Sequence, residues 1–259
     1  MGTRVTFIIP LLKEASGMVT ILEVKGVSKY FGGLRALHNV SLEVRRNELL
    51  GLIGPNGAGK TTLFNIICGD YRPTAGVIRF NGEDITRLKP YEICKKGISR
   101  TYQLVKPFLD LTVFQNVLFG VLFGRKRLEK KTAVEEVKKV LELTGLLKRS
   151  DMLVKNLTVF DRKKVELARA LATAPTLLLL DEPLAGLNPK EGEEFMHMTE
   201  TIRGNGVTIF MIEHVLRTLM KHADRIIVLH HGERLAEGSP AEVTNDRRVI
   251  EAYIGGAVC

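Results

Sequence analysis

The hydrophobic pattern of the first third of the chain predicts strands of two kinds. The segments are TILEVKGV at 20–27, LHNVSLEV at 37–44, NELLGLIG at 47–54 and GVIRFNGEDI at 76–85. LHNVSLEV alternates apolar and polar residues, as a half-buried strand does, and Asn81-Gly82 is a strong hairpin signal. NELLGLIG is a continuous apolar run, which fits a fully buried strand of a parallel sheet. This region therefore combines an antiparallel sheet with the beginning of a parallel one.

The middle of the chain, roughly 107–172, is predicted to be mostly helical. The segment TAVEEVKKVLELTGLL at 132–147 carries its apolar residues at helical spacing and its charges on the opposite face. The spaced positions are Val134, Val137, Val140 or Leu141, and Leu143 or Thr144. We expect these positions to face a core and the charged run at 125–139 to face solvent.

The last third of the chain alternates between strands and helices. The strands are TLLLLDE at 176–182, VTIFMIE at 207–213 and RIIVLHHG at 225–232, and the helices span 190–203 and 215–222. Apolar strands separated by helices indicate a parallel sheet covered by helices on both faces. A further helix is predicted after Ser239, because a capping Ser, a Pro and then a Glu at the third position are typical of a helix start.

Length and composition fit an ordinary globular chain. The chain has 259 residues, of which 45% are hydrophobic and 26% charged, and its formal net charge is +9. The basic residues are dispersed and Trp is absent, so we expect no nucleic-acid partner. Cys68, Cys94 and Cys259 lie far apart, which favours reduced thiols over a metal site.

No apolar run is long enough to span a membrane. The start of the chain has a short apolar stretch from Val5 to Leu12 that is broken by Pro10. We expect residues 1–17 to be an extension ahead of a natural start at Met18, and residues 18–259 to form a single domain.

The segment GPNGAGKT at 54–61 matches the pattern GxxxxGK[ST] and lies between a predicted strand and a predicted helix. Glycines let successive backbone N–H groups turn toward phosphate oxygens, and the start of the helix favours the same anion. Lys60 is expected to bridge two phosphates, and the Thr61 hydroxyl to bind Mg²⁺. The expected nucleotide-binding residues of this P-loop are Gly54, Pro55, Asn56, Gly57, Ala58, Gly59, Lys60, Thr61 and Thr62.

The strand LLLLDE at 177–182 ends in two acidic residues. Asp181, at the carboxyl end of this buried strand, is expected to position the Mg²⁺ that accompanies ATP. Glu182 is expected to act as general base toward the attacking water. The fold class that these segments predict is α/β, with a RecA-like P-loop NTPase core.

With these motifs the chain resembles the ATP-binding subunits of ABC transporters over residues 18–256. AGLNP at 185–189, IEH at 212–214 and AYIGG at 252–256 make it most similar to the branched-chain amino acid transport ATPases. The resemblance implies an antiparallel β subdomain, an inserted helical subdomain at about 107–172, and further site residues. Phe31 would stack on adenine, Gln103 would touch Mg²⁺ and the attacking water, and His214 would bond the γ-phosphate.

The same resemblance implies a head-to-tail dimer in which each ATP lies between one subunit's P-loop and the other's LSGGQ signature. Gly186, Leu187 and Asn188 belong to the D-loop at the dimer interface. The signature here reads LTVFD, formed by Leu157, Thr158, Val159, Phe160 and Asp161. Phe160 is expected to fill space that a glycine leaves open, and Asp161 to repel the partner's triphosphate. A heterodimer is therefore favoured over a homodimer, although a tolerated variant of the signature stays open.

By resemblance, we expect an ATP-hydrolysing subunit of an importer of branched-chain amino acids. Its partners would be membrane permease subunits, a second ATPase subunit and, indirectly, an extracytoplasmic solute-binding protein. It would be peripheral, at the cytoplasmic face of the cell membrane, docked near 103–108. Two alternatives remain: a non-transport ABC-type ATPase, for example in iron–sulfur assembly, and a catalytically weakened subunit.

Overall fold

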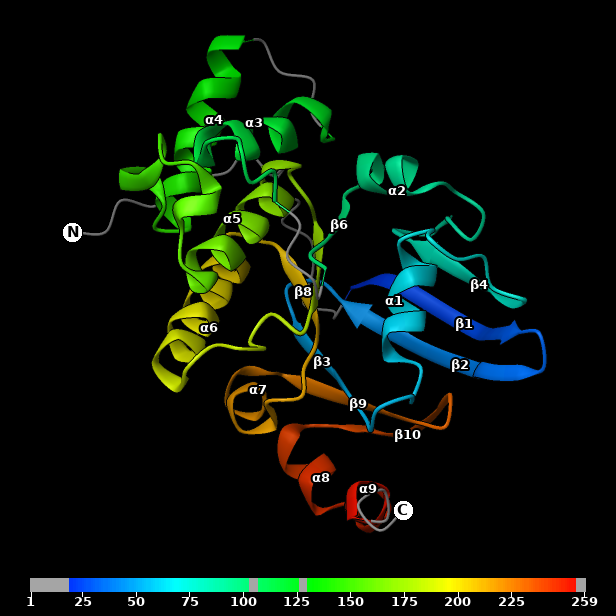
Figure 1. The fold of residues 1–259 in the computed structure, drawn as a ribbon. Helices are drawn as coiled ribbons and strands as arrows, with labels where there is room; N and C mark the ends of the chain where they lie inside the picture. Colours follow the sequence, from blue (N-terminus) through cyan, green and yellow to red (C-terminus); the bar gives the residue numbers. More distant parts are fainter. Residues whose placement is uncertain (1–18, 103–106, 126–129, 255–259) are drawn as a thin grey trace.

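The computed structural model describes residues 19–102, 107–125 and 130–254, and within them a six-stranded sheet crosses the centre of the molecule (Figure 1). Its strands are β3 (Leu49–Ile53), β6 (Ile98–Arg100), β7 (Leu177–Asp181), β8 (Thr208–Ile212), β9 (Arg225–His230) and β10 (Glu233–Gly238). They lie in the order β10-β9-β3-β8-β7-β6, and only the β10–β9 pair is antiparallel. The predicted parallel sheet is confirmed, and the antiparallel edge strand β10 was not predicted.

Both faces of this sheet are buried, and successive side chains alternate between two hydrophobic cores. In β7, Leu178 and Leu180 belong to one core, while Leu177 and Leu179 belong to the other. The period of two in a strand produces this division. It also explains why the strands read as continuous apolar runs, since neither face of a doubly covered parallel sheet meets water.

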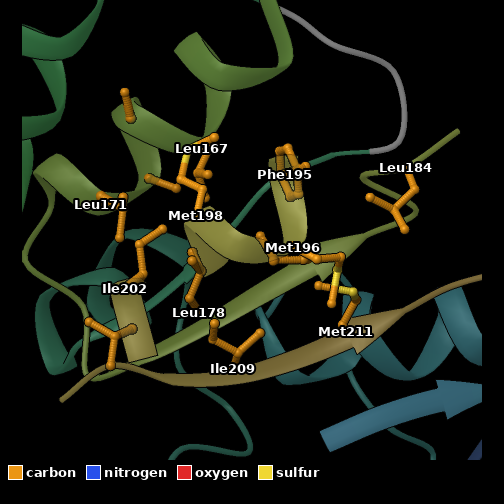
Figure 2. Packing of buried hydrophobic residues seen from close by; sticks show 14 of the residues in the cluster. Leu167, Leu171, Leu178, Leu184, Phe195, Met196, Met198, Ile202, Ile209 and Met211 are labelled. Carbon is orange, nitrogen blue, oxygen red and sulfur yellow. The ribbon is translucent and has the colours of Figure 1, made fainter. Parts of the chain in front are cut away.

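The first core is covered by helices. They are α3 (Val113–Phe123), α4 (Lys130–Leu143), α5 (Val159–Ala172), α6 (Pro189–Gly204) and α7 (Leu216–His222), with 3-10 turns at Leu147–Arg149 and Val154–Asn156. Figure 2 shows α6 side chains such as Met196 and Ile202 packed between Leu167 of α5 and Ile209 of β8. In Figure 1, α3, α4 and the upper part of α5 project beyond the central sheet as the expected helical layer.

The second core lies between the central sheet, a helix and an antiparallel sheet. That sheet has the order β2-β1-β4-β5 and consists of β1 (Thr20–Phe31), β2 (Leu34–Arg45), β4 (Ala75–Phe80) and β5 (Glu83–Asp84). Helix α1 (Lys60–Ile67) lies beside it (Figure 1), and α2 (Pro90–Lys96) follows the hairpin in the chain. The predicted hairpin turn is confirmed, because Asn81 and Gly82 both have positive φ, of 49° and 80°.

The C-terminal part of the chain forms α8 (Pro240–Asn245) and α9 (Arg247–Ile254). Ser239 caps α8 and exchanges hydrogen bonds with Glu242, as predicted. Helices α2 and α9 were not predicted. None of the helices in the described ranges is both long and apolar enough to cross a membrane.

One predicted core position is wrong. Val134 is 38% exposed, whereas Val137, Val140 and Leu141 are buried. Ala133 takes the buried position at the start of α4 instead. The helical phase differs by one residue there, because the first turn of α4 presents a small side chain to its neighbours.

Candidate nucleotide-binding site

The P-loop lies between the end of β3 and the start of α1, as predicted. Two of its glycines are needed for the backbone path. Gly54 has a φ of 151°, and a Cβ there would lie 2.1 Å from the carbonyl oxygen of Leu229. Gly59 has a φ of 98°, and its Cβ would lie 2.6 Å from the carbonyl oxygen of Ala36. A Cβ on Gly57 would instead meet no atom within 4 Å, so the loop backbone borders open space there.

A cavity of about 450 Å³ opens in front of this loop. Its lining brings together segments that are far apart in the sequence: Phe31, Leu34, Arg35, Ala36, residues 56–62, Glu182 and His214. The volume and the mixture of loop backbone, three basic side chains, one acid and one aromatic ring suit a small polar ligand. The sequence had not indicated Leu34, Arg35 or Ala36, because they carry no motif and reach the cavity from β2.

Lys60 is buried and folded back over the P-loop. Its Nζ donates to the carbonyl oxygens of Gly54 at 2.7 Å and Pro55 at 3.0 Å. Burial lowers the pKa of Lys60, while the negative charges of Glu182 and Asp181 oppose that decrease. The ammonium group therefore stands at the cradle with two carboxylates nearby, where it can exchange carbonyl contacts for phosphate oxygens.

Asp181 is buried at the end of β7 and is paired with Arg100 of β6. The Arg100 Nη2 lies 2.6 Å from Oδ2 of Asp181. Burial raises the pKa of Asp181, and the hydrogen bond from Arg100 opposes that increase. The other oxygen, Oδ1, is buried and has no hydrogen-bond partner among the described residues.

The unpaired Oδ1 of Asp181 shows whether this site suits a metal ion. A buried acceptor without a donor is costly unless a ligand or a water completes it. Carboxylate and hydroxyl oxygens are the ligands that Mg²⁺ prefers, usually with several waters retained. Asp181 and the exposed Thr61 in the first turn of α1 therefore fit a magnesium ion carried with a nucleotide.

Glu182 and His214 meet at the edge of the same cavity. His214 Nε2 lies 2.8 Å from Oε1 of Glu182, although the two residues come from different strand ends. Glu182 has a φ of 50°, a left-handed conformation that is rare outside glycine and is concentrated at functional sites. Its backbone N–H donates to the carbonyl oxygen of Ile212 at 2.9 Å, which holds it beside β8.

The aromatic residue predicted to stack on a base lies at the rim of the cavity. Phe31 is 42% exposed and contacts Tyr71 edge-on, with ring centroids 5.4 Å apart. Lys29 Nζ lies 4.9 Å from the Phe31 ring centre. An exposed ring at a cavity rim offers a face on which a flat base can stack. Gln103 lies outside the described residues, directly after Tyr102.

The predicted D-loop runs from β7 to α6. Gly186 has a φ of 75°, and Leu187 is partly buried against the first core. Asn188 caps α6, because its side chain accepts from the N–H of Glu191 and the Glu191 carboxylate accepts from the N–H of Asn188. This pair of hydrogen bonds is a capping box, which explains why an Asn stands at position 188 at the start of the helix.

The structure corrects the expectation for Phe160. Thr158 caps α5, and the first helical residue, Val159, is 60% exposed. Phe160 is only 8% exposed and packs into the first core, with Lys164 Nζ 4.4 Å from its ring centre. The residue that fills the outer surface of the LTVFD segment is therefore Val159. The helix turn directs the next side chain inward.

Asp161 is also not the free negative charge that its type suggested. It is 4% exposed, is bonded to Arg149, and lies 3.2 Å from Lys164 Nζ. Its second oxygen accepts from the Thr158 hydroxyl at 3.0 Å. Two cations surround this one carboxylate and offset its charge, while the repulsion of a partner's triphosphate stays a prediction.

Two functional candidates were missed from the sequence. Arg100 pairs with Asp181, and a buried Glu213 lies next to His214. Arg100 belongs to no motif of the sequence, and Glu213 stands in the segment IEH at 212–214 without a role of its own. The available signal was a charged residue within or beside an apolar strand, which needs a buried partner.

Comparison with known proteins agrees with this geometry. Residues 37–185 match the ABC transporter family, and residues 233–258 match the family described as branched-chain amino acid ATP-binding cassette transporter. The chain is 40% identical over 251 residues to the high-affinity branched-chain amino acid transport ATP-binding protein LivG of Salmonella typhimurium, covering 92% of this chain and 98% of that protein. It is 38% identical to BraF of Pseudomonas aeruginosa over the same shares of both chains.

A solved ATP-binding cassette of an ABC transporter in its ADP conformation is similar to the whole structure. The TM-score is 0.84 at 32% identity, covering 92% of this chain and 99% of that chain. The chain is therefore a transport ATPase subunit of the ABC transporter family and belongs to its branched-chain amino acid transport ATP-binding proteins.

Proposed function

We propose that this chain binds MgATP in the cavity at the P-loop and hydrolyses it to drive the import of branched-chain amino acids. The observation that carries this proposal is the convergence of the P-loop, Glu182 and His214 on one cavity, with the buried Asp181 directly before Glu182 in the chain. Lys60 holds the β- and γ-phosphates after leaving the carbonyl oxygens of Gly54 and Pro55. Thr61 and Asp181 hold Mg²⁺, which supplies charge neutralisation at the phosphates.

Glu182 accepts a proton from the water that attacks the γ-phosphorus, and the bond to the leaving oxygen of ADP breaks. His214 stays bonded to Glu182 and keeps its carboxylate directed at the cavity. Proton transfer to a positioned carboxylate contributes about 10²–10⁴-fold to a rate. Gln103, which follows β6 in the chain, contacts Mg²⁺ and the attacking water.

A second cavity, of about 760 Å³, suits a permease subunit. It lies between α2, α3 and α5, and its aromatic and charged lining includes Tyr91, Tyr102, Phe108, Phe119, Phe123 and Arg169. Phe123 is 71% exposed, and exposed apolar surface in a hollow marks an interaction site. A segment of the permease packs there, beside Tyr102, which directly precedes Gln103 in the chain.

This docking places the chain at the cytoplasmic face of the membrane as a peripheral subunit. The net charge of +9 suits a surface facing anionic lipid. A solute-binding protein outside the membrane acts on this chain only through the permease. Leucine, isoleucine and valine are the cargo that the family membership favours.

The second ATPase subunit is a different chain rather than another copy. In a head-to-tail dimer the LTVFD segment faces the partner's nucleotide. The Thr158 hydroxyl is engaged by Asp161, and the exposed Val159 side chain keeps the backbone from close approach. The side chains of Phe160 and Asp161 are buried, so neither reaches the surface that faces the partner. A heterodimer therefore has one site with this weakened segment and one site completed by the partner's intact signature.

Reconstitution tests these proposals together. The chain is co-purified with its permease and second ATPase subunits, placed in vesicles, and assayed for ATP-dependent uptake of labelled leucine with the binding protein present. Uptake by the wild type and none by Glu182→Gln supports transport. ATP hydrolysis without uptake of any of the three amino acids contradicts the proposed cargo. Equal ATPase rates per site for the chain alone and for the heterodimer contradict the proposed asymmetry.

A further inference from the structure

Glu213 is a buried carboxylate between the two strand ends that carry Glu182 and His214. It directly follows β8 and is 1% exposed. Its Oε1 accepts from the backbone N–H of Leu184 at 2.7 Å. Its Oε2 accepts from the backbone N–H of His214 at 3.0 Å and of Val215 at 3.3 Å.

These bonds connect two separate segments. Leu184 lies two residues after Glu182, on the chain that leaves β7. His214 and Val215 begin the chain that leaves β8. Beyond the strand ends the two backbones diverge, so their N–H groups lose the sheet as a partner. One carboxylate satisfies donors on both sides, as buried backbone groups require.

A carboxylate can accept hydrogen bonds at both of its oxygens. An amide of the same shape has one acceptor oxygen, and its NH₂ group would face an N–H donor. Burial and the negative charge of Glu182 raise the pKa of Glu213, while the three backbone hydrogen bonds oppose that increase. Burial lowers the pKa of Lys163 on α5, and the negative charge of Glu213 opposes that decrease.

We propose that Glu213 is a positioning residue for ATP hydrolysis, which ties the backbone after Glu182 to the backbone of His214. It thereby holds the 2.8 Å contact between His214 and Glu182 in place. This inference rests on the proposed roles of Glu182 and His214, and adds the element that sets their distance. Glu213 itself does not line the cavity, so it acts on the catalytic step rather than on nucleotide binding.

The test compares Glu213→Gln and Glu213→Asp with wild type in the assembled transporter. Glutamine keeps the shape and loses one acceptor, whereas aspartate keeps the charge and loses reach. For both variants kcat for ATP hydrolysis should fall about tenfold, and KM for ATP should stay within about twofold, because an interaction of the catalytic step is weakened.

Glu48→Gln is the matched control. Glu48 is also a buried carboxylate, pairs with Arg225, and accepts from the N–H of Arg45, but it lies away from the cavity. This variant should lose stability in thermal unfolding and keep its kcat per folded complex. A Glu213→Gln variant that behaves in the same way has a merely structural role, and the proposal is then wrong.

Two further measurements separate the possible explanations. In a His214→Ala background, Glu213→Gln should lower kcat by less than about twofold, because the effects of coupled residues are not additive. An undiminished effect overturns the proposal.

Amide hydrogen exchange of the wild-type chain should show protected N–H groups at Leu184, His214 and Val215. Rapid exchange at these amides overturns it without any variant having to fold. A wild-type complex that hydrolyses no ATP contradicts the proposed function instead.

Discussion

His214 donates through Nε2 to the carboxylate of Glu182 at 2.8 Å, although 32 residues separate the two in the sequence. The contact arises because β7 and β8 are parallel neighbours, with Asp181 in register with Ile212. Side chains that follow the carboxyl ends of neighbouring parallel strands meet at one edge of the sheet. Acid and imidazole are thereby presented together to the P-loop cavity.

Replacing Glu182 by Gln should abolish turnover and spare nucleotide binding. The rate of hydrolysis is expected to fall about 10²–10⁴-fold, because the amide cannot accept the proton of the attacking water. Lys60 and the P-loop glycines are unchanged, so the Kd for ATP should stay close to that of wild type. Single-turnover hydrolysis and equilibrium ATP binding measure the two effects. Glu135→Gln, an exposed change on α4, is the control and should alter neither. Substantial hydrolysis by Glu182→Gln would exclude this residue as the base.

Replacing Arg100 by Met should destabilise the fold and weaken the response to Mg²⁺. Asp181 would stay buried without its partner, which costs about 3–5 kcal/mol of unfolding free energy. Since the Arg100 hydrogen bond holds the pKa of Asp181 down, its loss should raise that pKa and reduce metal affinity. Urea denaturation and a Mg²⁺ titration of ATPase activity measure both. Arg79→Met, at an exposed site, is the comparison; equal stability losses in the two variants would contradict the prediction.

Restoring glycine at two adjacent signature positions should have unequal costs. Phe160→Gly removes a buried ring from the first core and should cost about 3–5 kcal/mol. Val159→Gly changes an exposed first-turn residue and should cost no more than about 1 kcal/mol. Chemical denaturation of the two variants gives the comparison directly. Similar losses would mean that Phe160 does not pack as the structure has it.

Glu166 should make stability depend on pH. Burial raises its pKa from 4.5 to about 6, against an opposing hydrogen bond from the N–H of Tyr102. The folded state therefore binds the proton more tightly than the unfolded state. This contribution to stability is complete below pH 4.5 and is lost as the pH rises through about 6.

The size of this loss should be about 2 kcal/mol, from the relation between a pKa difference and free energy. Denaturation curves between pH 4.5 and 7.5 measure it in the wild type and in Glu166→Gln. The glutamine keeps an acceptor for the Tyr102 N–H but has no proton to lose, so its curve should lack this component. An identical pH dependence in both proteins would assign the effect to other groups.

Much of the fold was predictable because the signals are local. The apolar runs at β3, β7, β8 and β9 predicted buried parallel strands, and the structure confirms each within a few residues. Asn81-Gly82 predicted its hairpin for the same reason. The strand β10 was missed because ERLAEG carries few apolar residues, and helix α9 was missed because eight residues give a short pattern.

The candidate site divides in the same way. The P-loop is a continuous segment, so its residues could be named from spacing alone. Arg100 and Glu213 could not, because their partners come from other strands and only a burial environment shows what each charge must contact. The prediction for the signature segment failed for a related reason. The residue types alone do not show that Phe160 points into the core or that two cations lie around Asp161.

The sequence by itself determined the alternation of strands and helices, the phosphate-binding loop, and the acidic pair at the end of β7. Hydrophobic periodicity and turn chemistry act over a few residues, so they can be interpreted without the fold. Only the tertiary structure decided that Glu182 meets His214, that Arg100 occupies one oxygen of Asp181, and that Asp161 is neutralised. Burial, charge pairing and side-chain direction depend on which distant segments lie together, and that is set by the packing of the whole sheet and its helices.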